Sequence, residues 1–316
     1  MKLVFLDQQT LAPEISLRTP DFPHQWQSYD ATAPEQVVER LQDADIVLLN
    51  KVRLTADILA QLPHLKLVAL AATGSDNVDL DACRQAGVAV CNIRDYSKNS
   101  VPEHALSLIM ALNRNLHAYR NSITQGRWQQ SGQFCYFDYP VRDLAGQTLG
   151  LIGYGTIARD LEKLAQALGM KVIVAARKGQ PATEGRVSFE QLLTNADVIS
   201  LHCPLNDDTH HLIAEPELKM MKSDALLINV GRGGLVDEAA LLSALQHQQI
   251  GGAGFDVVTA EPPAPDNPLI QALACPNFIL TPHIAWASQN AMQRLAEQLI
   301  DNVEAFVAGK EQNRLV

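Results

Sequence analysis

The stretch that decides the fold is Leu149-Gly150-Leu151-Ile152-Gly153-Tyr154-Gly155-Thr156-Ile157-Ala158. The apolar residues at its start predict a buried strand, and the segment after the glycines carries apolar residues at helical spacing. Glycines let a backbone approach a pyrophosphate closely, and the small Ala158 lets the helix pack near the strand. In this strand-turn-helix context the pattern predicts a doubly wound parallel sheet that binds a nicotinamide dinucleotide.

The end of the next predicted strand bears on the choice of dinucleotide. An Asp or Glu expected there to bind the ribose 2′-hydroxyl is replaced by Ala176, and Arg177 and Lys178 follow. Without the acid nothing repels a 2′-phosphate, and the two cations can pair with it. We therefore favour NADP(H), with Ala176, Arg177 and Lys178 as cofactor contacts. The alternative is that both cations are solvated and that NAD(H) binds without the carboxylate.

Similar apolar runs alternate with helical patterns along the whole chain. We expect strands at residues 3–6, 46–49, 67–71 and 88–91, and then at 149–152, 172–175, 198–202, 225–230, 254–258 and 278–280. Alternation of this kind predicts α/β units with parallel sheets.

The length of 316 residues exceeds the usual size of one hydrophobic core, so we expect two domains. Ser100 is predicted to cap a connecting helix, and a last helix follows Ser288. We expect an NAD(P)-binding Rossmann domain over residues 99–285, inserted in a discontinuous substrate-binding domain of residues 1–98 and 286–316. The fold class is then α/β, with two Rossmann-like or flavodoxin-like doubly wound parallel-sheet domains and the active site in the cleft between them.

Composition restricts the partners. The formal net charge is −10, and no stretch concentrates Lys and Arg as a nucleic-acid or anionic-membrane surface would require. An acid at Asp7 argues against a signal peptide, and no apolar run approaches the ~18 residues of a membrane span, so we expect a cytoplasmic protein. The five cysteines lack metal-binding spacing, which predicts free thiols and no metal site.

Three polar residues follow predicted strands and suggest chemistry. They are Arg232, Glu261 and His283. A guanidinium can bind a carboxylate through two hydrogen bonds and polarise the adjacent carbonyl. A glutamate beside a histidine favours imidazolium, which can donate a proton while a hydride reaches carbon. Alone, such an arginine is more often a surface ion-pair partner and such a histidine is usually structural, so the prediction depends on all three.

The motifs also carry a family resemblance. Their order is Gly153–Ala158, Leu201-His202-Cys203-Pro204-Leu205, Asn229–Glu238, Phe255–Val258 leading to Glu261-Pro262, and Thr281–Ser288. This order resembles the D-isomer-specific 2-hydroxyacid dehydrogenases over nearly the whole chain. The resemblance implies that Arg232 binds and polarises the substrate, that His283 is the acid/base, and that Glu261 orients and tunes it.

The same resemblance implies further contacts. Cofactor contacts are expected at Gly153, Tyr154, Gly155, Thr156, Ile157, His202, Cys203, Pro204, Val230, Gly231, Arg232, Asp256, His283 and Ala285, with Asp256 on the nicotinamide carboxamide. Substrate contacts are expected at Lys51, Thr73, Gly74, Ser75, Arg232, His283 and Trp286, with backbone groups at Gly74 and Ser75 on the carboxylate.

Within the family, Asn50-Lys51-Val52 and the segment from His283 to Ser288 look most like the glycerate dehydrogenases, also called hydroxypyruvate and glyoxylate reductases. The indole of Trp286 suits a two- or three-carbon acid, although it can equally serve interface packing. We therefore predict reduction of hydroxypyruvate or glyoxylate to the D-2-hydroxy acid. The alternatives are another D-2-hydroxyacid dehydrogenase, such as phosphoglycerate dehydrogenase, and a dinucleotide-sensing corepressor.

An aromatic run is the last feature of the sequence with a predicted role. It consists of Trp128, Phe134, Tyr136, Phe137 and Tyr139. These side chains could form a local core. In the family that the chain resembles, a comparable region helps to form a dimer, so we expect a homodimer.

Overall fold

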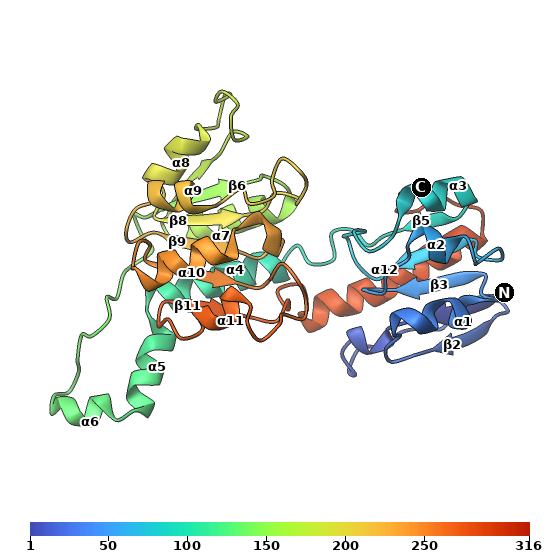
Figure 1. Ribbon diagram of the computed structural model, residues 1–316, viewed down its shortest axis with the longest axis horizontal. Coiled ribbons are helices and arrows are strands. Elements are labelled where there is room, and N and C mark those ends of the chain that lie inside the picture. The colour runs from blue at the N-terminus through green and yellow to red at the C-terminus, as the bar shows by residue number, and fades with distance from the viewer. The chain divides into compact units, whose positions relative to one another are not determined.

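The computed structural model describes residues 1–316 and divides into two compact units (Figure 1). Unit 1 comprises Met1–Ser97 and Ala287–Val316, and unit 2 comprises Lys98–Trp286. Each unit contains one sheet, of five and six strands, and every strand pair in both sheets is parallel. The predicted fold class of two parallel-sheet α/β domains is confirmed.

Unit 1 has the strand order β2-β1-β3-β4-β5. Its strands are β1 (Lys2–Phe5), β2 (Gln25–Ser28), β3 (Ile46–Leu49), β4 (Leu67–Leu70) and β5 (Ala89–Cys91). Its helices are α1 (Val37–Leu41), α2 (Ala56–Leu59), α3 (Leu80–Ala86) and α12 (Gln289–Val307), with short 3-10 turns at Gln8–Thr10 and Pro34–Gln36. The sequence did not predict β2, because this edge strand is mostly exposed and lacks an apolar run.

The C-terminal segment completes unit 1. Asn302 on α12 is buried, and its side-chain amide donates to the carbonyl of Asn92 at 2.9 Å. Beyond the helix, the N–H of Leu315 donates to the carbonyl of Val90 on β5 at 2.8 Å. Residues from both ends of the chain therefore form one core.

Unit 2 has the strand order β11-β10-β9-β8-β6-β7. Its strands are β6 (Thr148–Ile152), β7 (Lys171–Val174), β8 (Val198–Leu201), β9 (Leu226–Asn229), β10 (Gly252–Phe255) and β11 (Phe278–Leu280). Its helices are α4 (Ser100–Asn113), α5 (Leu116–Thr124), α6 (Arg127–Ser131), α7 (Thr156–Ala167), α8 (Phe189–Asn195), α9 (Glu215–Met220), α10 (Glu238–Gln246) and α11 (Pro268–Ala272), with a 3-10 turn at Gly233–Leu235.

The sheet of unit 2 reverses its strand order beside β6. An isolated parallel bridge between Ala175 and Val187 extends the sheet beyond β7, so the third strand of a Rossmann sheet is reduced here to a single bridge. The chain then crosses to β8, on the other side of β6. Open α/β sheets bind ligands at the carboxyl ends of the strands that flank such a reversal.

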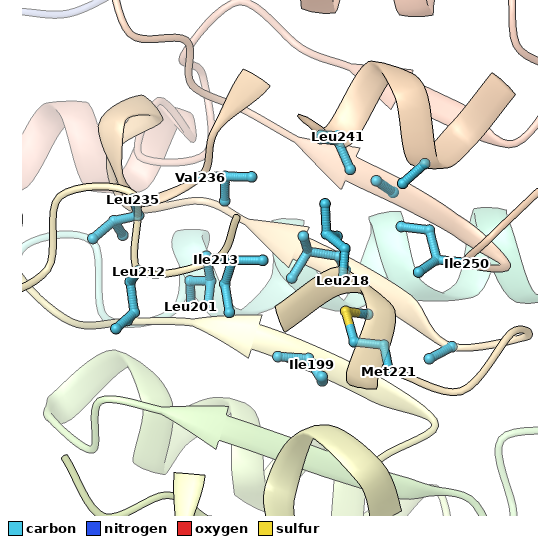
Figure 2. Close-up of a cluster of buried hydrophobic side chains, with 14 of the residues drawn as sticks. Ile199, Leu201, Leu212, Ile213, Leu218, Met221, Leu235, Val236, Leu241 and Ile250 are labelled. Carbon is cyan, nitrogen blue, oxygen red and sulfur yellow. The ribbon is translucent and has the colours of Figure 1, made fainter. Parts of the chain in front are cut away.

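Alternate residues of the unit 2 strands pack on opposite faces of the sheet. On one face, Ile199 and Leu201 of β8 pack with Leu218 of α9 and Leu241 of α10 (Figure 2). On the other face, Val198 and its neighbours pack against α4 and α7. Each fully buried aliphatic side chain contributes roughly 1.5–3 kcal/mol, so the carboxyl ends of these strands are held in fixed positions.

Two of the three helix caps predicted from the sequence are present. Ser188 forms the expected capping box with Gln191 at the start of α8, and Asp237 caps α10. Ser100, predicted as a cap, is instead the first residue of α4, and its hydroxyl donates to the carbonyl of Ala285 at 2.6 Å. Ser100 and Ala285 are both buried, so the carbonyl of Ala285 needs a hydrogen-bond donor, and the hydroxyl of Ser100 provides it.

An arm formed by α5, α6 and residues 132–142 extends from the sheet of unit 2 (Figure 1). The hydroxyl of Tyr119 donates to the carbonyl of Tyr139 at 2.7 Å, which closes the arm on itself. Phe134 and Phe137 are 87% and 84% exposed, so these two residues of the aromatic run do not form a local core. Large exposed apolar side chains that lie close together are typical of interaction surfaces.

None of the helices in the chain has both the length and the apolar character of a membrane span.

Candidate active site

The glycine turn after β6 meets the carboxyl end of β8. Gly153 has a φ of +87°, and a Cβ there would lie 2.5 Å from the backbone of both His202 and Cys203. Only glycine satisfies both the left-handed backbone and this close approach. A Cβ on Gly155, in contrast, would meet nothing within 4 Å. The turn is therefore packed tightly against β8 on one side and open at Gly155.

The open side is the N-terminus of α7. Gly155 is the N-cap and provides no side-chain hydrogen bond to the first N–H groups of this helix of 12 residues. Thr156 and Ile157 are the first two helical residues. Uncapped N–H groups together with the positive end of the helix dipole favour an anion. These features fit the pyrophosphate of a dinucleotide.

At the carboxyl end of β7, Lys178 forms an ion pair that the sequence did not predict. Ala176 is buried and Arg177 is exposed, but the ammonium of Lys178 lies 2.8 Å from the carboxylate of Glu217. Burial raises the pKa of Glu217, yet the hydrogen bonds from Lys178 and from the N–H of Ala214 outweigh it and leave the pKa below its usual value. Glu217 is buried and its charge needs a partner, which explains why Lys178 turns toward it.

His202 lies at the end of β8 beside the glycine turn. Its Nε2 is 2.9 Å from the hydroxyl of Ser200. Burial lowers the pKa of His202 to about 4, so the imidazole is neutral at physiological pH. A neutral ring here adds no positive charge to the cofactor side of the sheet.

Buried Asn229, the last residue of β9, shapes the loop that carries Arg232. Its amide donates to the carbonyl of Arg232 at 2.8 Å, and its side-chain oxygen accepts from the N–H of Gly231 at 3.1 Å. A Cβ on Gly233 would lie 2.0 Å from the carbonyl carbon of Val258. The Arg232 loop is thus packed directly on the backbone that leads to Glu261.

Glu261 and His283 form a hydrogen-bonded pair. His283 Nδ1 lies 2.6 Å from one carboxylate oxygen of Glu261, and the other oxygen accepts from the N–H of Val258 at 3.2 Å. Because a carboxylate accepts, Nδ1 carries the hydrogen, and Nε2 is the atom that can exchange a proton with a ligand. The side chains of His283 and Glu261 are 24% and 35% exposed, so the pair is accessible.

Asp256 holds the loop that carries His283. This aspartate is fully buried, and its carboxylate accepts from the N–H groups of Ile284 and Ala285 at 2.9 and 2.7 Å and from the hydroxyl of Thr281 at 2.5 Å. His283 itself has a φ of +56°, which is uncommon for a residue with a side chain. The bonds on either side of it maintain that conformation. The contact of Asp256 with nicotinamide stays a prediction.

Helix α4 supports the same loop. His104 Nε2 lies 2.9 Å from the hydroxyl of Thr281 and 3.6 Å from the carboxylate of Asp256. Ser100, one turn earlier, binds the carbonyl of Ala285. Sequence reasoning gave neither His104 nor Asn229 a role, because a polar residue within a motif does not show which backbone group it contacts.

In unit 1, the expected substrate residues follow two adjacent strands. Lys51 follows β3, and Thr73 to Ser75 follow β4. Asp7, buried at the end of β1, accepts from the N–H groups of Asn50 and Lys51 at 2.8 and 2.7 Å. Burial raises the pKa of Asp7 although these hydrogen bonds oppose it. The sequence gave no signal for this role of Asp7.

The segment after β4 is fixed by two further bonds. The hydroxyl of Thr73 donates to the carbonyl of Ile93 at 2.7 Å, and the amide of Asn92 donates to the carbonyl of Thr73 at 2.8 Å. These bonds fix the backbone that leads into Gly74 and Ser75. Trp286, the last residue of unit 2, is partly buried.

The neutral state of His202 predicts a pH effect on stability. In the unfolded chain a histidine takes up a proton near pH 6.5, whereas the folded imidazole stays neutral down to about pH 4. Unfolding is therefore favoured as the pH falls from about 7 to 5, and His202 contributes roughly 1–2 kcal/mol of that loss. Urea denaturation of wild type and His202→Asn at both pH values measures the difference. The exposed His247, replaced in the same way, is the control, and equal losses in wild type and His202→Asn would contradict the assignment.

Comparison with known proteins agrees with this geometry. Residues 106–285, more than half of the chain, match the family model described as D-isomer specific 2-hydroxyacid dehydrogenase, NAD binding domain. A glycerate dehydrogenase of Methylorubrum extorquens is 54% identical over 99% of this chain and 98% of its own. A hydroxypyruvate reductase of Blautia hydrogenotrophica is 35% identical over 99% of both chains.

Among solved structures, an acyclic imino acid reductase in complex with NADPH and D-Arg superposes with a TM-score of 0.83 at 30% identity, covering all of both chains. A glycine turn before an uncapped helix and a paired histidine and glutamate are thus found in a chain whose relatives are oxidoreductases. The chain belongs to the D-isomer specific 2-hydroxyacid dehydrogenase family and is an enzyme of that family.

Proposed function

We propose that the enzyme reduces hydroxypyruvate or glyoxylate to D-glycerate or glycolate with NAD(P)H. The observation that carries the proposal is the hydrogen bond of 2.6 Å between His283 and Glu261, on a loop clamped by buried Asp256. The Arg232 loop packs on the backbone just before Glu261, so an acid/base and a cation for a carboxylate are carried on one rigid edge of a sheet. The names of the relatives support the choice of substrate.

When bound, the dinucleotide supplies a hydride to the carbonyl carbon of the oxoacid. His283 then supplies the proton that the carbonyl oxygen needs, from Nε2, because Nδ1 is occupied by Glu261. In the reverse direction the same nitrogen accepts the proton of the hydroxyl group. In each reduction one carbon–hydrogen bond and one oxygen–hydrogen bond form, while the carbonyl π bond, a carbon–hydrogen bond of the hydride donor and the Nε2–H bond of His283 break.

Arg232 binds the substrate carboxylate and polarises the carbonyl. Its own carbonyl is fixed by Asn229, and one of its guanidinium nitrogens donates to the carbonyl of Gly231 at 2.9 Å. A guanidinium carries its N–H donors in a planar fork, which matches the geometry of a carboxylate.

The cofactor is held by the open N-terminus of α7 and by the end of β8. Gly153 to Ile157 face the pyrophosphate, and His202 to Pro204 line the adjacent strand end. Val230, Gly231, Asp256 and Ala285 complete the proposed contacts at the nicotinamide end. The absence of an acid at Ala176 and the exposed cation at Arg177 favour NADP(H) over NAD(H).

Unit 1 is proposed to bind the substrate, and unit 2 the dinucleotide. Lys51 and Thr73 are assigned to the substrate, and backbone groups at Gly74 and Ser75 to its carboxylate. We assign Trp286 to limiting the substrate to two or three carbons. The exposed aromatic side chains of the arm support a homodimer, and the enzyme is proposed to act in the cytoplasm.

Trp286 is expected to restrict the size of the substrate. We expect kcat/KM for hydroxypyruvate and glyoxylate to exceed that for 3-phosphohydroxypyruvate by about ten-fold or more, because a pocket limited by an indole excludes larger groups, and pyruvate serves as the three-carbon comparison. Steady-state rates for the four oxoacids with NADPH and with NADH measure this. A preference for the phosphorylated acid would instead identify a phosphoglycerate dehydrogenase.

Substitutions of His283 and of Arg232 are expected to have different effects. His283→Ala should lower kcat roughly 10²- to 10⁴-fold through loss of proton transfer, whereas Arg232→Ala should also raise KM for the oxoacid. Arg232→Lys keeps the charge but not the planar fork, and we expect it to recover only part of the loss. Dinucleotide binding, followed by nicotinamide fluorescence, should change little in all three variants. Collapse of that binding in Arg232→Ala would show that Arg232 has a different role.

A further prediction concerns Glu261. Reduction requires a protonated His283 and oxidation a neutral one, so kcat/KM for reduction should fall with rising pH while oxidation rises. Glu261→Gln removes a negative charge 2.6 Å from the imidazole, so both limbs should move to lower pH. Profiles in both directions test this, and limbs that superimpose in the two proteins would leave Glu261 without an electrostatic role.

A further inference from the structure

We propose that Arg186, together with Arg177, forms the site for the 2′-phosphate of NADP(H), and that Lys178 is not part of it. The inference rests on the proposed use of a nicotinamide dinucleotide and refines it to one residue that determines cofactor choice. Arg186 is exposed and lies nine residues beyond Arg177, near the end of the loop that joins β7 to α8. It is brought back to the end of β7 by the backbone.

The bridge between Ala175 and Val187 brings Arg186 to this place. The N–H of Ala176 donates to the carbonyl of Val187 at 2.8 Å, and the N–H of Val187 donates to the carbonyl of Val174 at 2.9 Å. The residue before Val187 is therefore held beside the carboxyl end of β7. In a Rossmann sheet, this strand end is where the adenosine ribose binds.

The guanidinium of Arg186 reaches across that strand end. It donates to the carbonyl of Ala175 at 2.9 Å. The N–H of Ala175 donates to the carbonyl of Leu151 on β6, and in an extended strand the N–H and C=O of one residue point to the same side. The carbonyl of Ala175 thus faces β6 and the glycine turn. Arg186 starts on the Val187 side of β7, so its charged end lies over the carboxyl end of β7, toward the turn.

Charges of both signs lie around this position, and the positive ones favour an anion. A hydrogen bond to Glu162 raises the pKa of Tyr154 in the glycine turn, and the positive charges of Arg159 and Arg186 oppose that rise. The guanidinium of Arg159 lies 5.4 Å from the ring centre of Tyr154. Two arginines therefore act on the turn itself, and Ala176 presents no carboxylate to either of them. One bond to a carbonyl leaves the guanidinium of Arg186 with donors for phosphate oxygens.

Lys178 provides a matched contrast. Its ammonium is bound to the carboxylate of buried Glu217 and lies 3.4 Å from the carbonyl of Leu212. Turning it toward a phosphate would leave Glu217 buried without its partner. The two cations that follow Ala176 in the sequence therefore have different functions: Arg177 is exposed at the strand end, and Lys178 stabilises the fold.

The experiment compares ligands that differ only in the 2′-phosphate. Binding of NADPH and NADH, and of 2′,5′-ADP and 5′-AMP, is measured by calorimetry for wild type, Arg186→Ala, Arg186→Lys and Lys178→Ala. We expect Arg186→Ala to weaken binding of NADPH and 2′,5′-ADP roughly 10- to 100-fold, with NADH and 5′-AMP changed less than about two-fold. Arg186→Lys should recover part of the loss. Lys178→Ala should lower Tm and leave the ratio of NADPH to NADH affinity as in wild type.

Two outcomes would overturn the proposal. One is an equal loss of NADPH and NADH binding in Arg186→Ala, and the other is a wild-type protein that binds 2′,5′-ADP no more tightly than 5′-AMP. A fall in the ratio of NADPH to NADH affinity in Lys178→Ala would likewise show that Lys178 belongs to the phosphate site. Because no oxoacid is present, these measurements stand apart from the substrate assignment, which the panel of oxoacids tests separately.

Discussion

The structure of the proposed active site depends on the buried carboxylate of Asp256. Its two oxygens bind N–H groups on the far side of His283, at Ile284 and Ala285, and the hydroxyl of Thr281 on the near side. Burying a carboxylate is unfavourable unless hydrogen bonds replace its water, and here backbone and hydroxyl donors do so. The loop cannot relax without leaving that charge unpaired. His283 is consequently held in a left-handed conformation that it would rarely adopt by itself.

Close backbone contacts at two glycines then set the distances between neighbouring loops. Gly153 brings the dinucleotide turn against the end of β8, and Gly233 brings the Arg232 loop against Val258. A Cβ at either position would lie within 2.5 Å of the backbone opposite, so neither loop could keep its place with another residue. The geometry that we propose for binding a carboxylate and for moving a proton therefore depends on backbone packing, which positions the side chains.

Much of the fold could be predicted from the sequence, because buried parallel strands are continuous apolar runs and their helices carry apolar stripes. The exposed edge strand β2 has neither feature, and it was missed. The spacing of Glu261 and His283 placed both near strand ends, although their hydrogen bond follows from tertiary structure. The ion pair of Lys178 could not be predicted, because its partner Glu217 lies 39 residues away and no local pattern relates the two. Arg186 is brought to the site by a single bridge, which is too short to leave a strand signal.

Both units have a buried aspartate at the carboxyl end of the sheet that binds backbone N–H groups of a neighbouring loop. In unit 1, Asp7 follows β1 and accepts N–H groups from the loop after the adjacent strand β3. In unit 2, Asp256 follows β10 and accepts N–H groups from the loop after the adjacent strand β11. Each buried acid fixes a neighbouring loop that carries a proposed ligand residue, Lys51 in one unit and His283 in the other. Because the acid and the loop belong to adjacent strands, the register of the sheet itself determines where each ligand residue begins. The sheets are thus the rigid elements from which both sets of proposed contacts take their position.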